Sequence, residues 1–405
     1  MITDQIREAA LPSPPRFGTL ERQPPDALLS LIGFYRQDPR SDKIDLGVGV
    51  YRNDAGETPV MRAIKAAECR LAETQSTKAY LGAEGDARFV ELLAPIVFGR
   101  PLSADPLLTG VQTPGGTGAL RLGAELIARG AGQPDVWIGT PTWPNHAPIF
   151  REAGLTVRSH SFFDAVTGTV DFAAMMEALD GAKAGDVVLV HGCCHNPTGA
   201  ELAPDEWAAL IAMIEERHLI PFVDLAYQGL GRGLDDDAAA TRALLAAVPE
   251  AIVAYSCDKN FGLYRDRVGA LWVKAASGEA IAAVRDNLLV LARSLWSMPP
   301  DHGAAAVREI LDDAVLTTSW TAELNEMRRR IASLRAALAN AEPRLAALAE
   351  QGGMFAMLPL ARDAVLSLRT SHGIYMADSG RINIAGLRSD TVAPFVAAIA
   401  PHLQR

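Results

Sequence analysis

The sequence predicts an α/β protein with a mostly parallel sheet and more than one domain. Short apolar runs that are typical of buried strands alternate with longer stretches of helical periodicity, and glycine or proline stands at most of the junctions. The chain has 405 residues, more than one hydrophobic core usually serves. After about residue 304 the pattern changes to long helices followed by short strands, which indicates a second domain.

The individual elements follow from this alternation. We expect strands at 136–139, 186–190, 219–223, 252–255 and 268–273, and helices at 117–129, 204–217 and 237–247. Parallel strands joined by crossover helices account for this order. In the second domain we expect a helix at 320–341, interrupted by Pro343, and strands at 354–358 and 381–384. The first 30 residues are rich in proline and lack periodicity, so we expect an arm rather than a folded unit there.

Composition and charge favour an ordinary globular protein. Apolar residues make up 49% of the chain and charged residues 21%. Charged residues interrupt even the longest apolar stretches, which are therefore much shorter than a segment that crosses a bilayer. The N-terminus is polar and does not resemble a leader peptide. We therefore expect a cytoplasmic protein with no membrane partner. A net charge of −10 argues against nucleic acid as the main partner.

The cysteines indicate neither a disulfide framework nor a metal site. Four are present, and the adjacent pair Cys193 and Cys194 would form a disulfide only under strain. This usage fits a reducing cytoplasm. His191 and His195 flank the pair, but ligands so close in sequence do not readily converge on one tetrahedral ion, and the chain has no CxxC motif. We therefore expect no metal.

Lys259 stands where a chemically active lysine is expected. The apolar run before it predicts a buried strand, and the turn at 260–262 follows it directly. The carboxyl end of a strand is where open α/β sheets bind ligands. Burial and the like charges of Arg265 and Arg267 would make Lys259 lose its proton more easily, and a neutral amine attacks carbonyls. A solvated loop lysine has the same local sequence, so other segments must decide between the two.

Three further segments carry polar groups at predicted strand ends or helix starts. Gly115 to Gly118 open a helix, so that free backbone amides and the positive helix end face an anion such as phosphate. This run matches neither the P-loop nor the dinucleotide fingerprint. Asp224 follows one predicted strand, with Tyr227 three residues on, and Asn196 lies in the turn-rich loop after another. Each alone is also typical of a cap or a turn, but together they indicate one site.

These residues resemble the fold-type I pyridoxal-phosphate enzymes, in particular the class I aminotransferases of the aspartate and aromatic-amino-acid branch. The resemblance spans nearly the whole chain. The matching motifs are Asp45 to Arg52, Gly56 to Val60, Tyr80 to Gly82, Pro114 to Leu120, Trp143 to His146, His191 to Gly199, Asp224 to Gly229, Lys259 to Gly269, Ser297 to Pro300 and Gly380 to Gly386. So many motifs in the same order make the resemblance highly specific.

The resemblance implies a domain plan. Residues 1–50 would form an N-terminal arm and part of the small domain. Residues 51–305 would form the large domain that binds pyridoxal 5'-phosphate, with a mostly parallel seven-stranded sheet flanked by helices. Residues 306–405 would form the small α+β domain, with a boundary helix at about 304–340.

The resemblance also implies how the cofactor is held. Lys259 would form the Schiff base with the cofactor aldehyde and later move the α-proton, and Asp224 would keep the pyridine nitrogen protonated. His146 and His191 would support Asp224, although plain packing explains these histidines equally well. The other cofactor contacts would come from Tyr227 and Asn196 at the ring hydroxyl, Trp143 on the ring face, and Gly116, Thr117, Ser256, Arg267 and the partner subunit's Tyr80 at the phosphate.

Substrate contacts are implied in the same way. Arg381 would grip the α-carboxylate in a bidentate manner, and Gly49, Trp143 and Asn196 would help to enclose it. Arg293 aligns with the arginine that crosses the dimer interface to bind a distal carboxylate, which favours aspartate and glutamate. Trp296 and Met298 are closer to the branch that also accepts aromatic substrates. We therefore expect an aromatic-amino-acid aminotransferase that is a homodimer and also takes acidic substrates, and a narrow aspartate aminotransferase is the alternative.

Two residues depart from the family pattern. Asp258, directly before Lys259, replaces a small hydroxyl residue; it would raise the lysine pKa if it faced the site, but it would have no such effect if it pointed away. Cys257 replaces an aromatic side chain, and we have no functional account of it. The same fold also supports elimination and decarboxylation, but the two arginines, Arg293 and Arg381, suit proton transfer at the α-carbon better. A ligand-sensing regulator would need a DNA-binding module, for which the sequence shows no segment.

Overall fold

A seven-stranded sheet forms the larger part of the molecule. The computed structural model describes residues 16–22 and 27–404, so most of the predicted N-terminal arm lies outside the described residues. The strand order is β2-β10-β9-β8-β7-β3-β4. The bounds are β2 Leu108–Pro114, β3 Asp135–Thr140, β4 Thr156–Ser161, β7 Val187–His191, β8 Ile220–Leu225, β9 Ala251–Ser256 and β10 Val268–Lys274. The prediction of a mostly parallel seven-stranded sheet is confirmed.

One strand of this sheet runs against the others. β10 pairs antiparallel with both β9 and β2, whereas the remaining neighbours pair parallel. The crossover helix and parallel direction expected for the strand at 268–273 are therefore wrong, although the sheet as a whole is mostly parallel. Only the loop 257–267 joins β9 to β10, and it is too short to hold a crossover helix, so the chain must return antiparallel. That loop carries Lys259.

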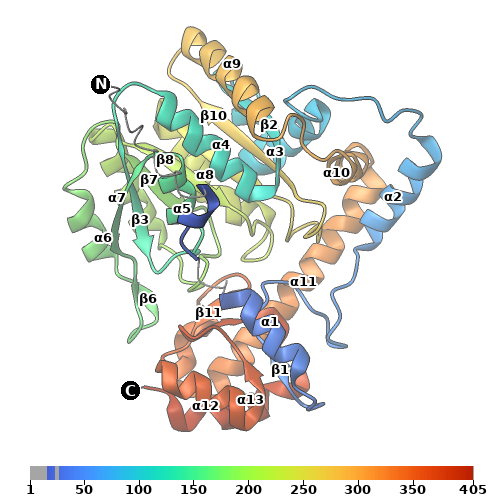
Figure 1. Ribbon diagram of the computed structural model, residues 1–405, viewed down its shortest axis with the longest axis vertical. Coiled ribbons are helices and arrows are strands. Elements are labelled where there is room, and N and C mark those ends of the chain that lie inside the picture. Colours follow the sequence, from blue (N-terminus) through green and yellow to red (C-terminus); the bar gives the residue numbers. More distant parts are fainter. Residues whose placement is uncertain (1–15, 23–26, 405) are drawn as a thin grey trace, which may run out of the picture.

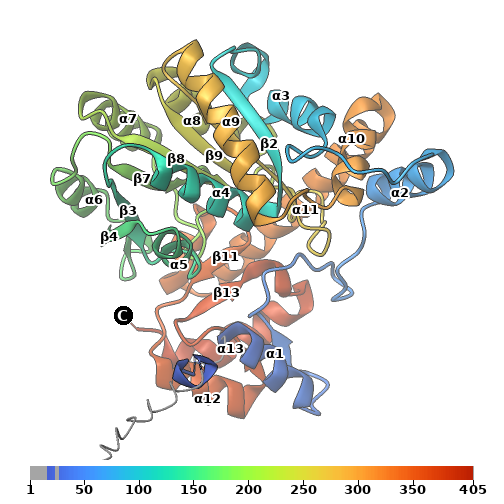
Figure 2. The same cartoon turned by 45° about the horizontal axis from the view of Figure 1, so that its top comes forward.

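Helices cover both faces of the sheet because its strands alternate in side-chain direction. Along β7, Val187 and Leu189 join one buried cluster and Val188 and Val190 the other. The first cluster packs under α4 (Gly115–Arg129), α5 (His146–Glu152) and α9 (Gly278–Leu295). The second packs under α3 (Ala87–Ser103), α6 (Phe172–Leu179), α7 (Pro204–Glu216) and α8 (Leu234–Ala247). Figure 2 shows α4 and α9 lying across one face of the sheet.

A smaller group of elements lies at the other end of the molecule (Figure 1). β11 (Phe355–Met357) and β13 (Arg381–Asn383) pair antiparallel beside α12 (Arg362–His372) and α13 (Val392–Ile399). β1 (Ile44–Asp45) pairs parallel with β12 (Ile374–Tyr375), which ties the N-terminal segment with α1 (Ala27–Gln37) to this group. The exact domain boundaries stay a prediction.

Helix α11 (Ala314–Ala341) connects the two groups. It begins next to α10 (His302–Asp312) and α2 (Arg62–Thr74), and it ends near α13. The predicted helix at 320–341 is therefore correct at its end but begins six residues too late. The Asp313 side chain accepts hydrogen bonds from the backbone N–H groups of Val315 (2.8 Å) and Leu316 (3.1 Å), and this cap sets the true start.

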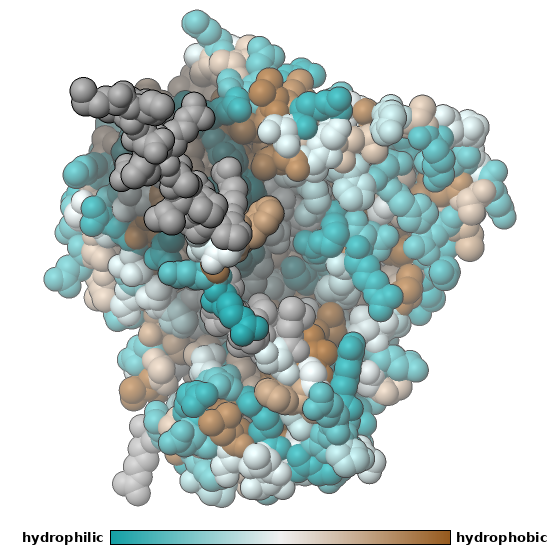
Figure 3. Space-filling model, viewed as in Figure 1, coloured by the Kyte–Doolittle hydropathy of each residue, from teal (hydrophilic) through white to brown (hydrophobic). Residues whose placement is uncertain are grey.

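The surface is mixed in character. On the face shown in Figure 3, hydrophobic side chains lie in separate groups between hydrophilic ones, as on many proteins in water. None of the helices in the described ranges has the length and hydropathy that crossing a bilayer requires.

Candidate active site

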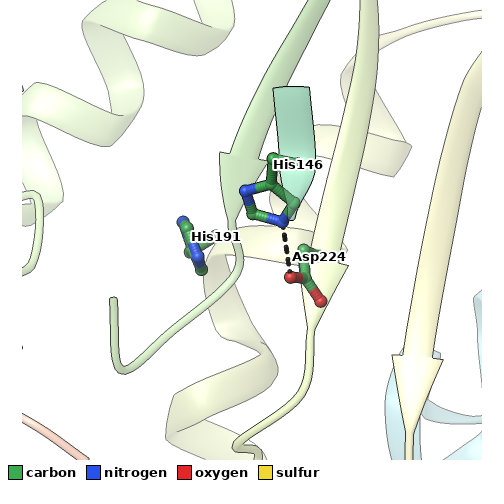
Figure 4. A group of neighbouring side chains, drawn as sticks. All are labelled: His146, His191 and Asp224. Carbon is green, nitrogen blue, oxygen red and sulfur yellow. Dashed lines mark hydrogen bonds and ion pairs between the residues drawn. The ribbon is translucent and has the colours of Figure 1, made fainter. Parts of the chain in front are cut away.

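The ends of the parallel strands bring the predicted residues together. Asp224 lies near the carboxyl end of β8, and its Oδ2 is 3.0 Å from Nε2 of His146, at the start of α5 (Figure 4). The carboxylate can only accept, so His146 donates from Nε2 and its Nδ1 accepts from the Thr142 hydroxyl at 2.8 Å. Burial acts to raise the Asp224 pKa, but the hydrogen bond from His146 and the nearby Lys259 act in the opposite direction, and the pKa is lowered. Asp224 is therefore a buried anion.

His191 contacts this pair without bonding to it. Its ring lies 5.2 Å from that of His146 and 4.2 Å from that of His195, and its Nε2 has no hydrogen-bond partner within the described residues. Burial, with a smaller effect from His146, lowers the His191 pKa to about 3. A neutral imidazole fits the packing interpretation of His191, whereas His146 supports Asp224 directly. The ligand atoms of these two histidines and Asp224 lie within 4.8 Å of one another, so the absence of a metal stays a prediction.

Lys259 faces the same site from the loop after β9. Its Nζ lies 5.2 Å from the centroid of the Tyr227 ring. Burial is the main cause that lowers the Lys259 pKa, and Arg267 acts in the same direction, while Asp258 and Asp224 oppose them. Arg265, the other arginine we expected to contribute, is exposed. A lysine with a lowered pKa is the nucleophilic amine that the sequence predicts.

Tyr227 and Asn196 form a second polar pair. Asn196 Nδ2 donates to the Tyr227 hydroxyl at 3.3 Å, and both side chains are buried. Burial, followed by the charge of Asp224, raises the Tyr227 pKa, so the phenol keeps its proton and can donate it. Asn196 Oδ1 is buried without a partner in the part of the chain that the structure describes. The pair therefore has hydrogen-bonding capacity left for a ligand.

The start of α4 forms an anion cradle with two other segments. A Cβ on Gly115 would lie 2.6 Å from Arg267 Nη2, and one on Gly116 would lie 3.1 Å from Ser256 Cβ, so glycine lets both side chains approach the helix start. Ser256 Oγ accepts from the Asp258 N–H at 3.2 Å, which leaves its own proton free to donate. Together with Thr117 in the first turn of α4, these groups offer amides, hydroxyls and a guanidinium to a phosphate. The phosphate contacts that the resemblance implies include Gly116 and Thr117 of this glycine run but not Gly115, whose lack of a side chain admits Arg267.

Arg381 approaches from the smaller group of elements. Its Nη2 donates to Gly47 O at 2.8 Å, and its guanidinium carbon lies 4.9 Å from the centroid of the Phe355 ring. Burial lowers its pKa, and its Nε is buried without a partner among the described residues. A Cβ on Gly49 would lie 2.7 Å from Phe355 Cζ, so glycine is needed there to admit the ring. Arg381 is thus positioned and still has donors for a carboxylate.

Trp143 lies beside His146 in the site, whereas Tyr80 and Arg293 lie on the surface. The Trp143 ring packs edge-on against His146 with the centroids 5.3 Å apart. Tyr80 is 94% exposed, and the exposed Arg293 donates to the Ser297 hydroxyl. The next residue, Leu81, donates its N–H to Met298 Sδ at 3.1 Å, so the segments that carry Tyr80 and Arg293 meet on one surface. Neither residue contacts another predicted site residue in the interactions described for this chain.

Comparison with known proteins decides the family. The sequence profile of the class I and II aminotransferases matches residues 41–399. The chain belongs to this family. The tyrosine aminotransferase of Rhizobium meliloti (strain 1021) is 54% identical over 381 residues, 93% of this chain and 97% of the relative. The aspartate aminotransferase of Escherichia coli (strain K12) is 41% identical over 395 residues, 96% of this chain and 100% of the relative.

A solved structure shows the same fold with the cofactor. The aromatic-amino-acid aminotransferase from Burkholderia pseudomallei, covalently bound to pyridoxal phosphate, matches with a TM-score of 0.93 and 36% identity over 96% of this chain and 100% of that chain. The prediction of a fold-type I aminotransferase that uses pyridoxal phosphate is confirmed. The residues of this chain also fit that cofactor, since the anion cradle, the buried Asp224 and the Lys259 amine match its phosphate, pyridine nitrogen and aldehyde.

Proposed function

We propose that this aminotransferase moves the amino group between aromatic or acidic L-amino acids and 2-oxoglutarate or another 2-oxo acid by a ping-pong mechanism, with aromatic amino acids preferred. The observation that carries the proposal is Arg381, a half-buried arginine whose buried Nε has no partner among the described residues and whose guanidinium carbon lies 4.9 Å from the centroid of the Phe355 ring. It provides a carboxylate site beside Phe355, whose ring packs edge-on against that of Tyr227 with the centroids 5.9 Å apart. Relatives named for tyrosine and for aspartate support both halves of the substrate range.

Each predicted residue has a proposed role that its surroundings support. Pyridoxal phosphate, when bound, supplies the electron sink that stabilises the carbanion left when the α-proton departs. Lys259 binds the cofactor aldehyde and then carries that proton, which its lowered pKa favours. Asp224, held ionised by His146, keeps the pyridine nitrogen protonated. Tyr227 and Asn196 hydrogen-bond the ring hydroxyl, Trp143 stacks on the ring, and Gly116, Thr117, Ser256 and Arg267 hold the phosphate.

The substrate preference is tested in a single half-reaction. We expect L-phenylalanine and L-aspartate, each added without an oxo acid, to convert the lysine-bound cofactor to its amine form, with phenylalanine at least as efficient per unit concentration. Absorbance of the cofactor follows the conversion directly. Conversion by aspartate alone would identify a narrow aspartate aminotransferase, the alternative that Arg293 supports. No conversion by either amino acid, with the cofactor bound, would contradict the proposed substrates.

We also propose that the working enzyme is a homodimer. Tyr80 and Arg293 are exposed on one surface together with Leu81, Val290 and Leu295, which are 41%, 56% and 38% exposed. An apolar group of this kind beside an arginine is a typical subunit contact. In a symmetric pair each chain would lend these residues to its partner's site, Tyr80 to the phosphate and Arg293 to a distal carboxylate.

Subunit complementation tests this arrangement. Lys259→Ala and Arg293→Ala homodimers should both transaminate aspartate poorly. After the two are mixed and their subunits exchange, one site of each hybrid combines a native Lys259 with the native Arg293 of the other chain. Aspartate activity should therefore return to about a quarter of the wild-type rate, because about half of the dimers are hybrids with one intact site of two. If activity did not return although exchange was shown, Arg293 would act within its own subunit.

Two further proposals, on the domains and on the location, complete the functional assignment. We infer a large cofactor domain at 51–305 and a small domain at 306–405 that residues 1–50 join in part, so that Arg381 closes on the substrate as the parts approach. The pairing of β1 with β12 supports this division. We further infer that the enzyme works in the cytoplasm, because all four of its cysteines are free thiols.

A further inference from the structure

Asp258 forms an ion pair with Arg267, the arginine of the anion cradle. Its Oδ2 accepts from Arg267 Nη1 in an ion pair, and Nη1 also donates to Tyr264 O at 3.2 Å. The Asp258 side chain is only 5% exposed, whereas that of Arg267 is 40% exposed. The guanidinium therefore extends from a buried carboxylate to the open cradle, where its Nη2 faces Gly115.

The carboxylate itself is incompletely satisfied. Asp258 Oδ1 is buried and has no hydrogen-bond partner among the described residues. Among the described residues, Arg267 is therefore the ion-pair partner of this carboxylate, and no further hydrogen bond reaches Oδ1. Arg267 also holds a positive φ of 56°, an unfavourable conformation for a non-glycine residue, so its position is fixed by its surroundings. The arginine is thus held in place and partly neutralised by the same residue.

We propose that Asp258 is a built-in counter-ion of Arg267 that competes with the cofactor phosphate and so weakens cofactor binding. A phosphate in the cradle must share Arg267 with Asp258 and lies near the charge of that carboxylate. A neutral residue before Lys259, such as the small hydroxyl residue of the family pattern, would leave both nitrogens of the guanidinium fork to the phosphate. Because it has Asp258, this enzyme would exchange its cofactor more readily than a relative that has a hydroxyl residue at this position.

Binding measurements on the cofactor-free enzyme test this proposal with three probes. We expect Asp258→Asn and Asp258→Ser to bind inorganic phosphate and pyridoxal phosphate about tenfold more tightly or better, which is roughly the strength of one charge-assisted hydrogen bond. Pyridoxal lacks the phosphate and reports any effect that passes through Lys259, whose pKa Asp258 acts to raise, so pyridoxal phosphate should gain about tenfold more affinity than pyridoxal does. Calorimetry gives all three affinities without reference to substrate or turnover, so failure of the substrate assignment would not affect the result.

A matched control separates this effect from the general loss of an ion pair. Asp135, at the start of β3 and therefore at the opposite end of the sheet from the site, also forms an ion pair with an arginine, Arg158. Asp135→Asn should leave all three affinities unchanged. Asp258→Ser keeps the hydroxyl that the family pattern has there, so a folding defect of the asparagine variant alone does not prevent the test. Unchanged or weaker phosphate binding in a folded variant would overturn the proposal, since Asp258 would then only position Arg267.

Discussion

Replacing Lys259 with alanine is expected to lower the rate of amino transfer by at least about 10⁴-fold, the upper range of what one positioned acid–base group contributes. The variant loses the only amine that the loop between β9 and β10 presents to Tyr227, and with it both the attachment of the cofactor and the group that carries the α-proton. No neighbour replaces it, because Arg267 is engaged by Asp258 and cannot serve as a base at neutral pH.

Two measurements check this expectation. The absorbance band of the lysine-bound cofactor should be missing from Lys259→Ala, although the phosphate cradle and Asp224 should still retain the cofactor. Added ammonia or methylamine should restore part of the rate, since a free amine can carry the proton that Lys259 moved. Lys65→Ala removes an exposed lysine of α2 and should behave as the wild type. A Lys259→Ala variant with more than a hundredth of the wild-type rate would assign the proton transfer to another group.

Much of the site was predictable because strand ends are visible in the sequence. Each of Asp224, Ser256 and Lys259 follows or closes an apolar run, and the carboxyl ends of parallel strands meet at one edge of a sheet. The glycine run before α4 was visible in the same way. Local sequence thus predicts which residues lie at that edge, and the structure brings Asp224, Lys259, Tyr227 and Asn196 together there.

The features that the sequence pattern did not predict depend partly on local details and partly on contacts between segments or between chains. The direction of β10 follows from the length of the loop before it, and the start of α11 follows from the Asp313 cap, which are local details that the alternation hides. The direction of the Asp258 side chain was open, because an extended segment can point a residue either way; in the structure it forms an ion pair with Arg267, nine residues later in the chain. The proposed roles of Tyr80 and Arg293 depend on a contact with a second chain, which the sequence of one chain does not describe.

The second large effect is expected at Asp224. Asp224→Asn keeps the size of the side chain and an oxygen to accept from His146 Nε2, now 3.0 Å away, so the fold should be preserved. It removes the negative charge that holds a proton on the pyridine nitrogen. Without that proton the ring withdraws electrons poorly, and the carbanion is stabilised less. We expect a loss of about 10³-fold or more in the rate of α-proton removal, since electrostatic stabilisation of developing charge contributes on this scale.

A chemically altered cofactor separates this role from structural damage. Pyridoxal phosphate methylated on its ring nitrogen carries a permanent positive charge and needs no proton from its surroundings. It should raise the rate of Asp224→Asn well above the rate with the natural cofactor, while Lys259→Ala should gain nothing from it. Isotope exchange at the substrate α-carbon reads out proton removal itself. If the methylated cofactor gave no gain although it bound, Asp224 would act by orienting the ring through His146 rather than by its charge.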